Sequence, residues 1–530
     1  MDLHQKLKNR QHDQIWREYC GFLDLTTAEY MEIQNRLMLE QIDLYSRCEL
    51  GRIIMKGNKP ATVEEFRNMV PLTKYDDYAD ILLPKIDSAL PERPVTWIET
   101  TWEGGKHPVK VAPYTEGMIN SHKNISITII ILATSSKKGE FSLKGTEKFL
   151  YGMAPLPYLT GLVPYLIASQ LPVTFLPSIE DAESMSFGQR NKVGFELGMQ
   201  KGIDLFFGLS SVVVKIGESF VLGEKSANKH NFLKNSPKMN YRLLTAWLNS
   251  KKNKKPIMPK DIWKLKGLIC TGTDTASLKK IIEKYWGVKP LEIFGGTEPA
   301  CIATETWSKN GLVLFPDVDF YEFIPRVEFE KNLVDPSYVP NTYLLDELLA
   351  GEEYELVISN FKGGAFARYR TGDILKCLSL KNEEENLKLP QFAFVDRDPR
   401  FIDIAGFTRI SERTISEALE LSKLNLNQWF AVKETDEHKR TYLHLYVEVG
   451  EEGLRSLFTK EIIKEHLSIY FRCLDSDFSN LKALLGIDPL RVSIIPSGTI
   501  SKFEEVFGRS LRKINPSHFD VVEVLKIARG

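Results

Sequence analysis

Between residues 95 and 215, short apolar runs typical of β-strands alternate with longer runs of helical spacing. The strand-like runs read VTWIET, VKVAPYT, PVTFLPS and IDLFFGLSSVVVKI. Strands that alternate with helices form βαβ units, because a parallel partner strand is reached only through a crossover connection. The pattern therefore predicts an α/β fold built on a mainly parallel sheet.

Other segments add helices and further strands to this plan. Apolar residues recur every three or four positions in residues 1–60, which predicts helices. VPLTKYDDYADILLP (70–84) predicts an aromatic-rich helix with a capping threonine and a proline stop. ISITIIILA (125–133) is about half of what a membrane span needs, and it reads as a buried strand or helix. GLICTGTD (267–274), LEIFGGTE (291–298) and YELVISN (354–360) predict strands that end in polar turns.

The chain has 530 residues, more than one hydrophobic core accommodates, so two or three domains are expected. After the charged loop KNEEENLK (381–388) the pattern changes to a small α+β unit. We place the boundary near Asp398–Pro399, which gives a large domain over 1–397 and a small one over 398–530.

Composition excludes several classes of function. The net charge of −1 gives no general attraction to nucleic acid or to an anionic membrane, so neither is an expected partner. The lysine cluster at 251–255 reads as a solvated loop. The six cysteines form no CxxC pair, which argues against a zinc or disulfide framework and for reduced thiols. The polar N-terminus is no signal peptide, and a cytoplasmic location is expected.

Two strand-end turns carry residues suited to a nucleotide. IFGGTEP (293–299) places two glycines before Thr297 and Glu298, so backbone can approach a phosphate beside a carboxylate suited to Mg²⁺. ARYRTGDIL (367–375) ends a predicted strand at Asp373, which can accept both hydroxyls of a ribose. Taken alone, each motif is equally compatible with an ordinary tight turn or hairpin turn. Neither a P-loop nor a GxGxxG fingerprint is present.

Two later segments carry basic residues. DRDPRFIDIAGFTRI (396–410) places Arg397 and Arg400 around a proline. The segment is interpreted either as a hinge with an arginine near a ligand or as a loop with a salt bridge. PSGTISKFEEVFGRSLRKINPSHF (496–519) carries Lys502 and Lys513. These lysines are ordinary solvated side chains unless the small domain folds over a site.

The order of these motifs along the chain resembles the adenylate-forming superfamily of acyl-activating enzymes. VPLTKYDDYADILLP, TGTDTASLKKIIEKYWG and GGAFARYRTGDIL are similar to the auxin-responsive-promoter (acyl acid–amido synthetase) family, in its bacterial-like branch. The resemblance covers about residues 60 to 520. It implies a large multi-sheet N-terminal α/β domain that holds ATP and an acyl acid, and a small, mobile α+β C-terminal domain.

The activity implied is activation of a carboxylic acid by ATP and Mg²⁺ as an acyl-adenylate, with transfer to an amine, usually an amino acid. Thr297 would contact the α-phosphate, Asp373 the ribose, and Glu298 the metal. The implied nucleotide-binding residues are Thr100, Thr101, Gly104, Gly105, Thr273, Asp274, Gly295, Gly296, Thr297, Asp373 and Arg397. Of these, Thr273 and Asp274 would flank the adenine. Glu298 would be the metal ligand. Lys513, or alternatively Lys502, would neutralise charge in the adenylation transition state.

TTWEGGKHPVKVAPYT (100–115) matches the family's phosphate-gripping loop in position, in its glycines, in Lys110 and in its PYT tail. Trp102 and Glu103 stand where glycine and threonine are expected. Two other interpretations therefore stay open. One is an acyl-adenylate ligase that transfers to coenzyme A or a carrier protein, and the other is a catalytically impaired nucleotide-binding scaffold. The apolar segments from Tyr151 through Leu162 to about Ser211 are either the acyl pocket wall or ordinary core.

Overall fold

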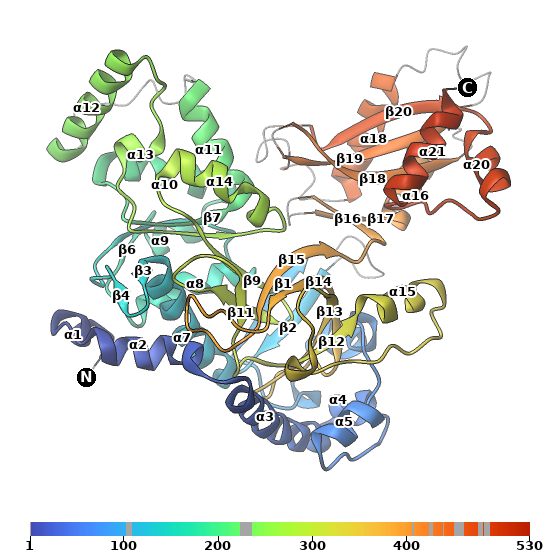
Figure 1. Cartoon of the computed structure of the whole chain (residues 1–530), viewed down its shortest axis with the longest axis horizontal. Coiled ribbons are helices and arrows are strands. Elements are labelled where there is room, and N and C mark those ends of the chain that lie inside the picture. The colour runs from blue at the N-terminus through green and yellow to red at the C-terminus, as the bar shows by residue number, and fades with distance from the viewer. Residues whose placement is uncertain are drawn as a thin grey trace. The chain divides into compact units, whose positions relative to one another are not determined.

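The computed structural model describes residues 2–101, 109–222, 236–404, 408–422, 428–437, 439–449, 460–474, 481 and 488–529. The chain divides into two compact units (Figure 1). The large unit comprises Met1–Thr100 and Lys110–Val395, and the small unit comprises Thr101–Val109 and Asp396–Gly530. Each unit is described by itself. The domain boundary between residues 397 and 398 stays a prediction.

The N-terminal segment is helical, as its periodicity predicts. The helices are α1 (Leu3–Lys8), α2 (His12–Cys20), α3 (Thr27–Arg47), α4 (Glu49–Ile54) and α5 (Val63–Met69). The longest, α3, begins at a capping box in which the Thr26 hydroxyl accepts from the Glu29 N–H while the Glu29 carboxylate accepts from the Thr26 N–H.

The helix predicted over residues 70–84 is shorter than expected. It comprises a 3-10 turn (Tyr75–Asp77) and α6 (Ala79–Leu82). The predicted cap, Thr73, instead joins the sheet: its N–H donates to the Arg368 carbonyl (2.9 Å), and its carbonyl accepts from the Arg370 N–H (3.0 Å). Thr73 therefore fastens this segment to the strand that carries the TGD motif.

One long mixed sheet organises the large unit. Within the described residues it has eleven strands in the order β12-β13-β14-β15-β11-β10-β9-β8-β7-β5-β6. Their bounds are β5 (Lys148–Gly152), β6 (Thr174–Leu176), β7 (Leu205–Leu209), β8 (Gly267–Thr271), β9 (Leu291–Gly296), β10 (Ala300–Glu305), β11 (Leu312–Leu314), β12 (Asp319–Pro325), β13 (Glu353–Asn360), β14 (Tyr369–Ser379) and β15 (Gln391–Arg397).

The sheet changes direction at β9. Strands β6, β5, β7, β8 and β9 pair in parallel, whereas β9–β10, β10–β11, β11–β15, β12–β13 and β13–β14 pair antiparallel. The prediction of a mainly parallel sheet thus holds for one half only. Two short ribbons, β1 (Thr96–Thr101) with β2 (Val109–Tyr114) and β3 (Ser135–Lys137) with β4 (Glu140–Phe141), lie outside it.

Helices precede the first parallel strand and connect the later ones. They are α7 (Glu116–Ala133), α8 (Leu159–Ala168), α9 (Ile179–Glu183), α10 (Phe187–Lys201), α11 (Ser210–Leu222), α12 (Pro237–Asn253), α13 (Pro259–Ile262), α14 (Thr275–Trp286) and, among the antiparallel strands, α15 (Arg326–Val334). The ambiguous run ISITIIILA is helical and forms most of α7. The run IDLFFGLSSVVVKI is divided between β7 and α11, so its prediction as a single strand was wrong.

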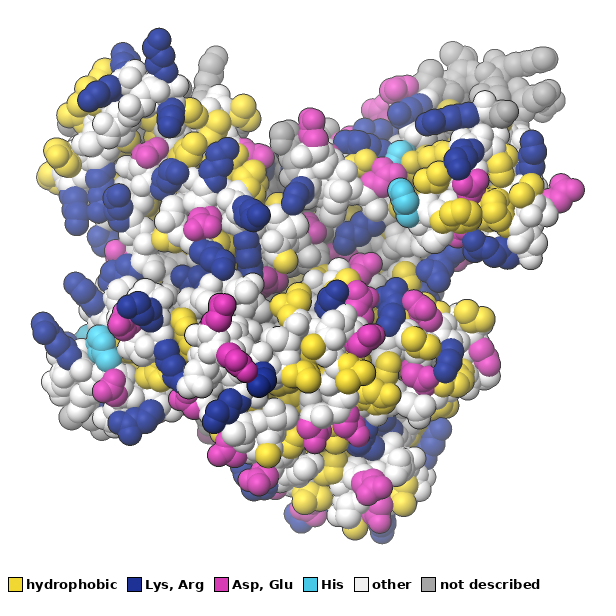
Figure 2. Space-filling model, in the orientation of Figure 1, with side chains coloured by type: hydrophobic (Ala, Val, Ile, Leu, Met, Phe, Trp, Pro, Cys, Tyr) yellow, Lys and Arg dark blue, Asp and Glu magenta, His cyan; other side chains and the backbone are white. Residues whose placement is uncertain are grey.

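Aromatic residues fill the core beneath α10, α11 and α14. Phe206 of β7 and Trp286 of α14 are fully buried, with ring centroids 5.1 Å apart. Figure 2 shows Lys and Arg side chains over α12 and nearby helices with acidic side chains among them, and acidic side chains again around α3 to α5. Lys251 and Lys252 are exposed in the last turn of α12, so the predicted loop is partly helix.

The small unit is α+β, as predicted. It contains a hairpin of β16 (Phe401–Ile404) and β17 (Thr408–Ser411), a sheet of β18 (Trp429–Thr435), β19 (Thr441–Val449) and β20 (Leu490–Pro496), and helices α16 (Glu412–Ser422), α18 (Lys460–Leu474), α20 (Thr499–Phe507) and α21 (His518–Ala528). Strand alternation builds a core on each face. Trp429 and Ala431 belong to the core that includes α16 and α18, whereas Phe430 belongs to the core that includes α20 and α21.

Among the helices in the described ranges, none combines the length and the apolar character that crossing a bilayer requires.

Candidate active site

The GGTEP turn joins β9 to β10, where the sheet changes from parallel to antiparallel. A Cβ on Gly295 would lie 2.0 Å from the Ala300 carbonyl oxygen, so only glycine fits there. Ala300 has a positive φ of 60°. The turn thus ends a parallel strand at a point where strand order and direction change, a place where ligands bind in α/β sheets.

Glu298 of this turn lies in a buried cluster with Lys110 and Tyr369. Lys110 Nζ donates to Glu298 Oε1 (2.5 Å) and to the Tyr369 hydroxyl oxygen (2.8 Å), and the Tyr369 hydroxyl donates to Glu298 Oε1 (2.5 Å). The three residues are only 5%, 9% and 3% exposed, in the order Lys110, Glu298, Tyr369. At such burial the Lys110 ammonium and the Glu298 carboxylate compensate each other's charge, because an unpaired buried charge is strongly destabilising.

This geometry bears on the predicted metal ligand. Within the described ranges, no three His, Cys, Asp or Glu side chains gather in a way that would hold a metal ion. A single carboxylate still fits Mg²⁺, which usually keeps several waters and binds through one or two carboxylates and substrate phosphates. Glu298 therefore remains compatible with a Mg²⁺ held mainly by a nucleotide, and its role as a ligand stays a prediction.

Two further side chains fix the GGTEP turn. The Tyr114 hydroxyl donates to the Thr297 carbonyl (2.8 Å), and Asn360 Nδ2 donates to the Glu298 carbonyl (3.1 Å). Asn360 also donates to Asp319 Oδ1 (2.8 Å). Burial raises the pKa of Asp319 well above its usual value. The backbone on which Thr297 and Glu298 stand is therefore tied to the end of β2 through Tyr114 and to the end of β13 through Asn360.

Tyr75 and Tyr369 enclose the Lys110 ammonium. Lys110 Nζ lies 5.4 Å from the Tyr75 ring centroid and 5.5 Å from the Tyr369 ring centroid. The Tyr75 hydroxyl accepts from the Val111 N–H (2.5 Å), and burial raises the Tyr75 pKa to about 12. Aromatic faces and one carboxylate thus replace water around the ammonium.

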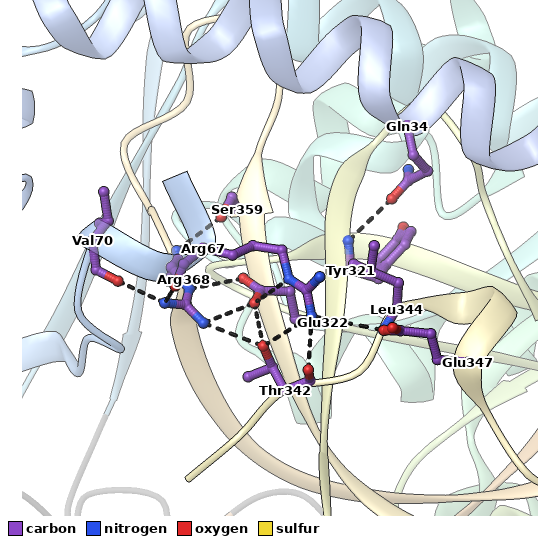
Figure 3. A network of polar contacts seen from close by, with 10 residues as sticks. All are labelled: Gln34, Arg67, Val70, Tyr321, Glu322, Thr342, Leu344, Glu347, Ser359 and Arg368. Atoms are coloured by element: carbon purple, nitrogen blue, oxygen red, sulfur yellow. Dashed lines mark hydrogen bonds and ion pairs between the residues drawn. The ribbon is translucent and has the colours of Figure 1, made fainter. Parts of the chain in front are cut away.

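The two arginines of ARYRTGD are structural. Figure 3 shows Arg368 and Arg67 converging on Glu322, with Thr342 alongside. Arg368 Nε and Nη2 donate to the two Glu322 oxygens at 3.0 and 2.8 Å. Arg370 Nε donates to both Glu355 oxygens, at 3.1 and 3.0 Å, and its Nη2 donates to Glu355 Oε2 (2.5 Å). Arg370 points away from Tyr369, since neighbouring residues within β14 face opposite sides. Both arginines hold β14 in place.

Asp373 lies in a bulge within β14, and the strand runs on to Ser379. The prediction that a strand ends at TGD was therefore wrong. Val357 pairs with Arg370 and Glu355 pairs with Ile374, so the residues between them bulge out of the ladder, with Gly372 at a φ of 74°. The buried Asp373 donates its backbone N–H to Thr371 Oγ1 (3.1 Å). Such bulges commonly re-aim side chains next to active sites.

An apolar cavity of about 210 Å³ ends at the GGTEP turn. Its lining comes from α7, α8 and the ends of the parallel strands: His122, Ile125, Ser126, Ile129, Ile130, Phe149, Tyr158, Leu159, Thr160, Val163, Leu166, Ile167, Phe207, Ile269, Thr271, Ile293, Phe294, Gly295, Gly296, Thr297, Ala300 and Cys301. The expected pocket wall is partly right, since α8 contributes, whereas Tyr151 lines a different cavity. The part of the cavity wall that α7 contributes was not predicted from the sequence.

His122 is a titratable group in the wall of this cavity. Burial, with the nearby charge of Lys362, lowers its pKa to about 4. Its ring centroid lies 5.7 Å from that of Tyr114. The imidazole is therefore neutral at physiological pH, and the cavity beside it is suited to an apolar or aromatic group.

The predicted adenine turn follows β8, the strand beside β9. Asp274 stands at the N-cap position of α14 and makes no side-chain capping hydrogen bond there. The Thr275 hydroxyl hydrogen-bonds to the Ser210 hydroxyl (2.7 Å), which ties α14 to the start of α11. Thr273 and Asp274 are partly exposed. Because β8 and β9 are parallel neighbours, this turn and the GGTEP turn lie at the same edge of the sheet.

The predicted phosphate loop lies within the described residues only at its ends. Thr100 and Thr101 close β1, and Lys110 lies in β2. Gly104 and Gly105 lie outside the described residues. The structure therefore brings Lys110, from the far end of the loop segment, to Glu298.

The remaining predicted residues belong to the small unit. Arg397 Nη1 pairs with the buried Asp403 at 2.5 Å, as in the salt-bridge interpretation, and Arg400 pairs with Asp398. Lys502 is exposed on α20. Lys513 is also exposed, lies 3.2 Å from Glu412, and stands 5.4 Å from the Trp429 ring centroid.

Asn515, two residues after Lys513, has a structural position. Its Nδ2 donates to the Phe401 carbonyl (2.9 Å), and its Oδ1 accepts from the Lys433 N–H (2.9 Å). Asn515 therefore holds the hairpin segment against β18, which fixes where Lys513 emerges from the small unit.

Known proteins share parts of this arrangement. Residues 312–397 match the GH3 family central domain. The chain is 25% identical over 232 residues to jasmonoyl–L-amino acid synthetase JAR4 of Nicotiana attenuata, covering 40% of this chain and 36% of that relative. The match thus spans about a third of the relative's length.

Solved structures extend the likeness to most of the chain. AtGH3.15 acyl acid amido synthetase in complex with 2,4-DB gives a TM-score of 0.51 at 16% identity and covers 96% of this chain and 95% of that one. A 2-hydroxyisobutyryl-CoA ligase in complex with 2-HIB-AMP and CoA gives a TM-score of 0.58 at 15% identity, covering 97% and 94%. The matches confirm the predicted family resemblance and the predicted fold.

Proposed function

We propose that this chain, which carries a GH3 central domain, is an ATP-dependent acyl acid–amido synthetase. It activates a carboxylic acid as an acyl-adenylate and transfers the acyl group to an amine, an amino acid by preference. The similarity to JAR4, a jasmonoyl–L-amino acid synthetase, supports the proposal. The fold shared with an acyl acid amido synthetase also supports it.

The observation that carries the proposal is the junction of the apolar cavity with the polar turn. Gly295, Gly296 and Thr297 line the end of the cavity, and Glu298, the next residue, is in the charged cluster with Lys110. An enzyme that joins a carboxylic acid to a nucleotide needs this arrangement: apolar space for the acyl group, opening onto groups that handle phosphate charge.

The chemistry has two steps. In the first, an oxygen of the carboxylate attacks the α-phosphorus of ATP, the bond to the bridging oxygen breaks, and pyrophosphate leaves. In the second, the amine nitrogen attacks the acyl carbon, AMP leaves, and the amine loses a proton. The protein contributes mainly positioning and charge compensation.

The residues have the following proposed roles. Thr297, with the backbone of Gly295 and Gly296, would hold the α-phosphate, and Asp373 would accept the ribose hydroxyls. Thr273 and Asp274 would flank the adenine. The segment with Thr100, Thr101, Gly104, Gly105 and Lys110 would hold the β- and γ-phosphates. Arg397 would lie near the nucleotide, and Lys513, or alternatively Lys502, would compensate transition-state charge.

Mg²⁺ would be held by Glu298, phosphate oxygens and water, and when bound it would neutralise phosphate charge. The Lys110 ammonium, which is paired with Glu298 in this structure, is suited to the same phosphate groups.

The test is the identity of the acyl product. The protein is incubated with ATP, Mg²⁺, a panel of carboxylic acids and the twenty amino acids, with coenzyme A in a parallel reaction, and products are read by mass spectrometry. An acyl–amino acid formed without a thioester supports the proposal. A thioester without an amide indicates a coenzyme A ligase instead.

A third outcome, ATP binding with neither product, indicates the scaffold interpretation. Calorimetric titration with ATP tests whether ATP binds at the proposed site. The isosteric Asp373→Asn variant is expected to bind ATP about ten- to a hundredfold more weakly, since a charge-assisted hydrogen bond contributes about 1.5–3 kcal/mol.

A further inference from the structure

A second cavity, of about 120 Å³, lies on the other side of α8 from the acyl cavity. Val163, Leu166 and Ile167 of α8 face the acyl cavity, whereas Gly161, Pro164 and Tyr165 line this one. Its other walls come from β5, β6, α9 and α10. One water needs about 10–15 Å³ measured in this way, so the space is that of a small organic molecule.

Arg190 is the cation of this cavity. The residue is only 7% exposed, it lines the cavity from α10, and its Nε donates to the Met185 carbonyl at 3.3 Å. It forms no ion pair with any carboxylate that the structure describes. Burial lowers its pKa, whereas the nearby Tyr165, Tyr151 and Glu183 act in the opposite direction. Because a buried guanidinium strongly favours a compensating anion, the cavity is suited to a ligand that brings one.

Glu183 is the anion of the same cavity. It ends α9 and is exposed, and its Oε1 accepts from the Tyr165 hydroxyl at 2.6 Å. Tyr165 also lines the cavity. Although Glu183 and Arg190 line one small space, these two described side chains do not pair with each other. The cavity therefore presents a cation and an anion that interact electrostatically without forming an ion pair.

The rest of the cavity wall is mostly apolar and aromatic. Tyr151, Leu156, Phe175, Pro177 and Ile179 contribute to it. Tyr151 and Phe175 are buried and meet edge to face, with ring centroids 6.2 Å apart. A ligand that fits must therefore carry an acid, a base and a hydrocarbon group within a small volume.

We propose that this cavity binds a free α-amino acid with an apolar side chain. Its carboxylate pairs with Arg190, its ammonium faces Glu183 and Tyr165, and its side chain packs against Tyr151 and Phe175. A phosphate or a dicarboxylate fits less well, because Glu183 would repel its second charge. As an acceptor site the cavity rests on the proposed function and deepens it, whereas the binding itself requires neither ATP nor an acyl acid.

The test is calorimetric titration of the whole chain with L-leucine, without ATP. Two analogues of similar shape serve as probes: 4-methylpentanoate lacks the amine, and 3-methylbutylamine lacks the acid. Leucine is expected to bind at least about tenfold more tightly than either, because only leucine engages both charged groups.

Three variants assign the site. Arg190→Met keeps the length of the side chain and is expected to abolish leucine binding. Glu183→Gln, at an exposed position that places folding at little risk, is expected to weaken leucine about tenfold and to leave 4-methylpentanoate unchanged. Val163→Phe fills the acyl cavity instead and is the matched control, with leucine binding expected to be unchanged. Thermal unfolding checks that each variant is folded.

Two results would overturn the proposal. One is a wild-type protein that binds leucine no better than the two analogues. The other is leucine binding that survives Glu183→Gln undiminished or is lost in Val163→Phe.

The product assay then distinguishes two roles of the bound amino acid, acceptor substrate and effector. Incorporation of leucine into amide, with a KM raised by Glu183→Gln, identifies the acceptor. A leucine-dependent change in rate without incorporation identifies an effector. Because binding is measured without ATP, failure of this site and failure of the proposed enzymatic activity are distinguishable.

Discussion

Lys110 Nζ lies 2.5 Å from Glu298 Oε1, and this buried pair joins two motifs that are 188 residues apart in the sequence. One motif is the tail of the TTWEGGKHPVK segment, and the other is the GGTEP turn. Tyr369, at the start of the strand that carries Asp373, donates its hydroxyl to the same oxygen. Three of the sequence motifs that suggested a nucleotide site therefore meet at one carboxylate.

Removing one member of this pair is expected to destabilise the fold. Lys110→Met should lower the free energy of unfolding by about 3–5 kcal/mol, because it leaves a buried carboxylate without its partner. Lys110→Met combined with Glu298→Gln should recover most of that loss, since no buried charge remains. Urea unfolding of the two single variants and the double variant measures this. A double variant whose loss equals the sum of the single losses would contradict the coupling.

The two glycines of the GGTEP turn are expected to differ. Gly295→Ala places a Cβ 2.0 Å from the Ala300 carbonyl oxygen, so backbone must shift. At Gly296 the nearest atom, in Pro299, is 3.4 Å away, which is ordinary contact. Gly295→Ala should therefore lower the midpoint of thermal unfolding by several degrees and weaken ATP binding, with Gly296→Ala close to wild type in stability. Equal unfolding midpoints for the two variants would show that the turn accommodates a side chain at Gly295.

The neutral, buried His122 makes stability depend on pH. Its pKa is about 4 in the folded protein, against 6.5 for the ordinary group. Between these values the unfolded chain binds the proton and the folded chain does not. The contribution of His122 to the free energy of unfolding is therefore fully present above pH 6.5 and is lost as the pH drops toward 4. The loss from this one group should reach about 3 kcal/mol.

His122→Gln should remove this part of the slope while leaving the contribution of the carboxylates. Urea unfolding at pH 7.0, 5.5 and 4.5 compares the variant with the wild type. Parallel stability curves for the two proteins would contradict the assignment to His122.

Replacing Lys513 is expected to slow the reaction with little change in stability, and Lys502 provides the comparison. Lys513→Ala should slow acid-dependent pyrophosphate release by about a hundredfold or more, because a charge-compensating group is lost. Its exposed pair with Glu412 contributes at most about 1 kcal/mol, so stability should hardly change. Lys502→Ala, on the exposed face of α20, is the matched control and should retain most of the rate. A larger loss of rate in Lys502→Ala would move the catalytic role to that residue.

Local pattern predicted the elements well wherever one period dominated. The N-terminal helices and the strands before GGTEP and TGTD follow from spacing alone. The run IDLFFGLSSVVVKI was misread as one strand because its residues are apolar throughout, and the step from β7 to α11 at Ser210 leaves no periodic signal. The bulge at Gly372 was hidden for a related reason, since a glycine in a strand marks a turn and a bulge alike.

The site could be predicted only to the level of its motifs. Glu298 and Lys110 were singled out as separate features, but their pairing depends on long-range packing that no local pattern contains. Tyr369 and Asn360 were missed. Each lies in a quoted motif, but a strand Tyr or a strand-end Asn is most often a packing or turn residue. The role of Arg368 and Arg370 as partners of Glu322 and Glu355 likewise needed the register of the sheet.

The central claim is that the junction of apolar cavity and GGTEP turn activates an acid with ATP. The most direct test is pyrophosphate release from ATP and Mg²⁺ across a panel of carboxylic acids, with hydroxylamine present to trap the acyl-adenylate. The account predicts release that depends on one class of apolar or aromatic acid, gives the matching hydroxamate, and needs about ten- to a hundredfold more ATP in Asp373→Asn. No release with any acid of the panel, while ATP binding is intact, would contradict it.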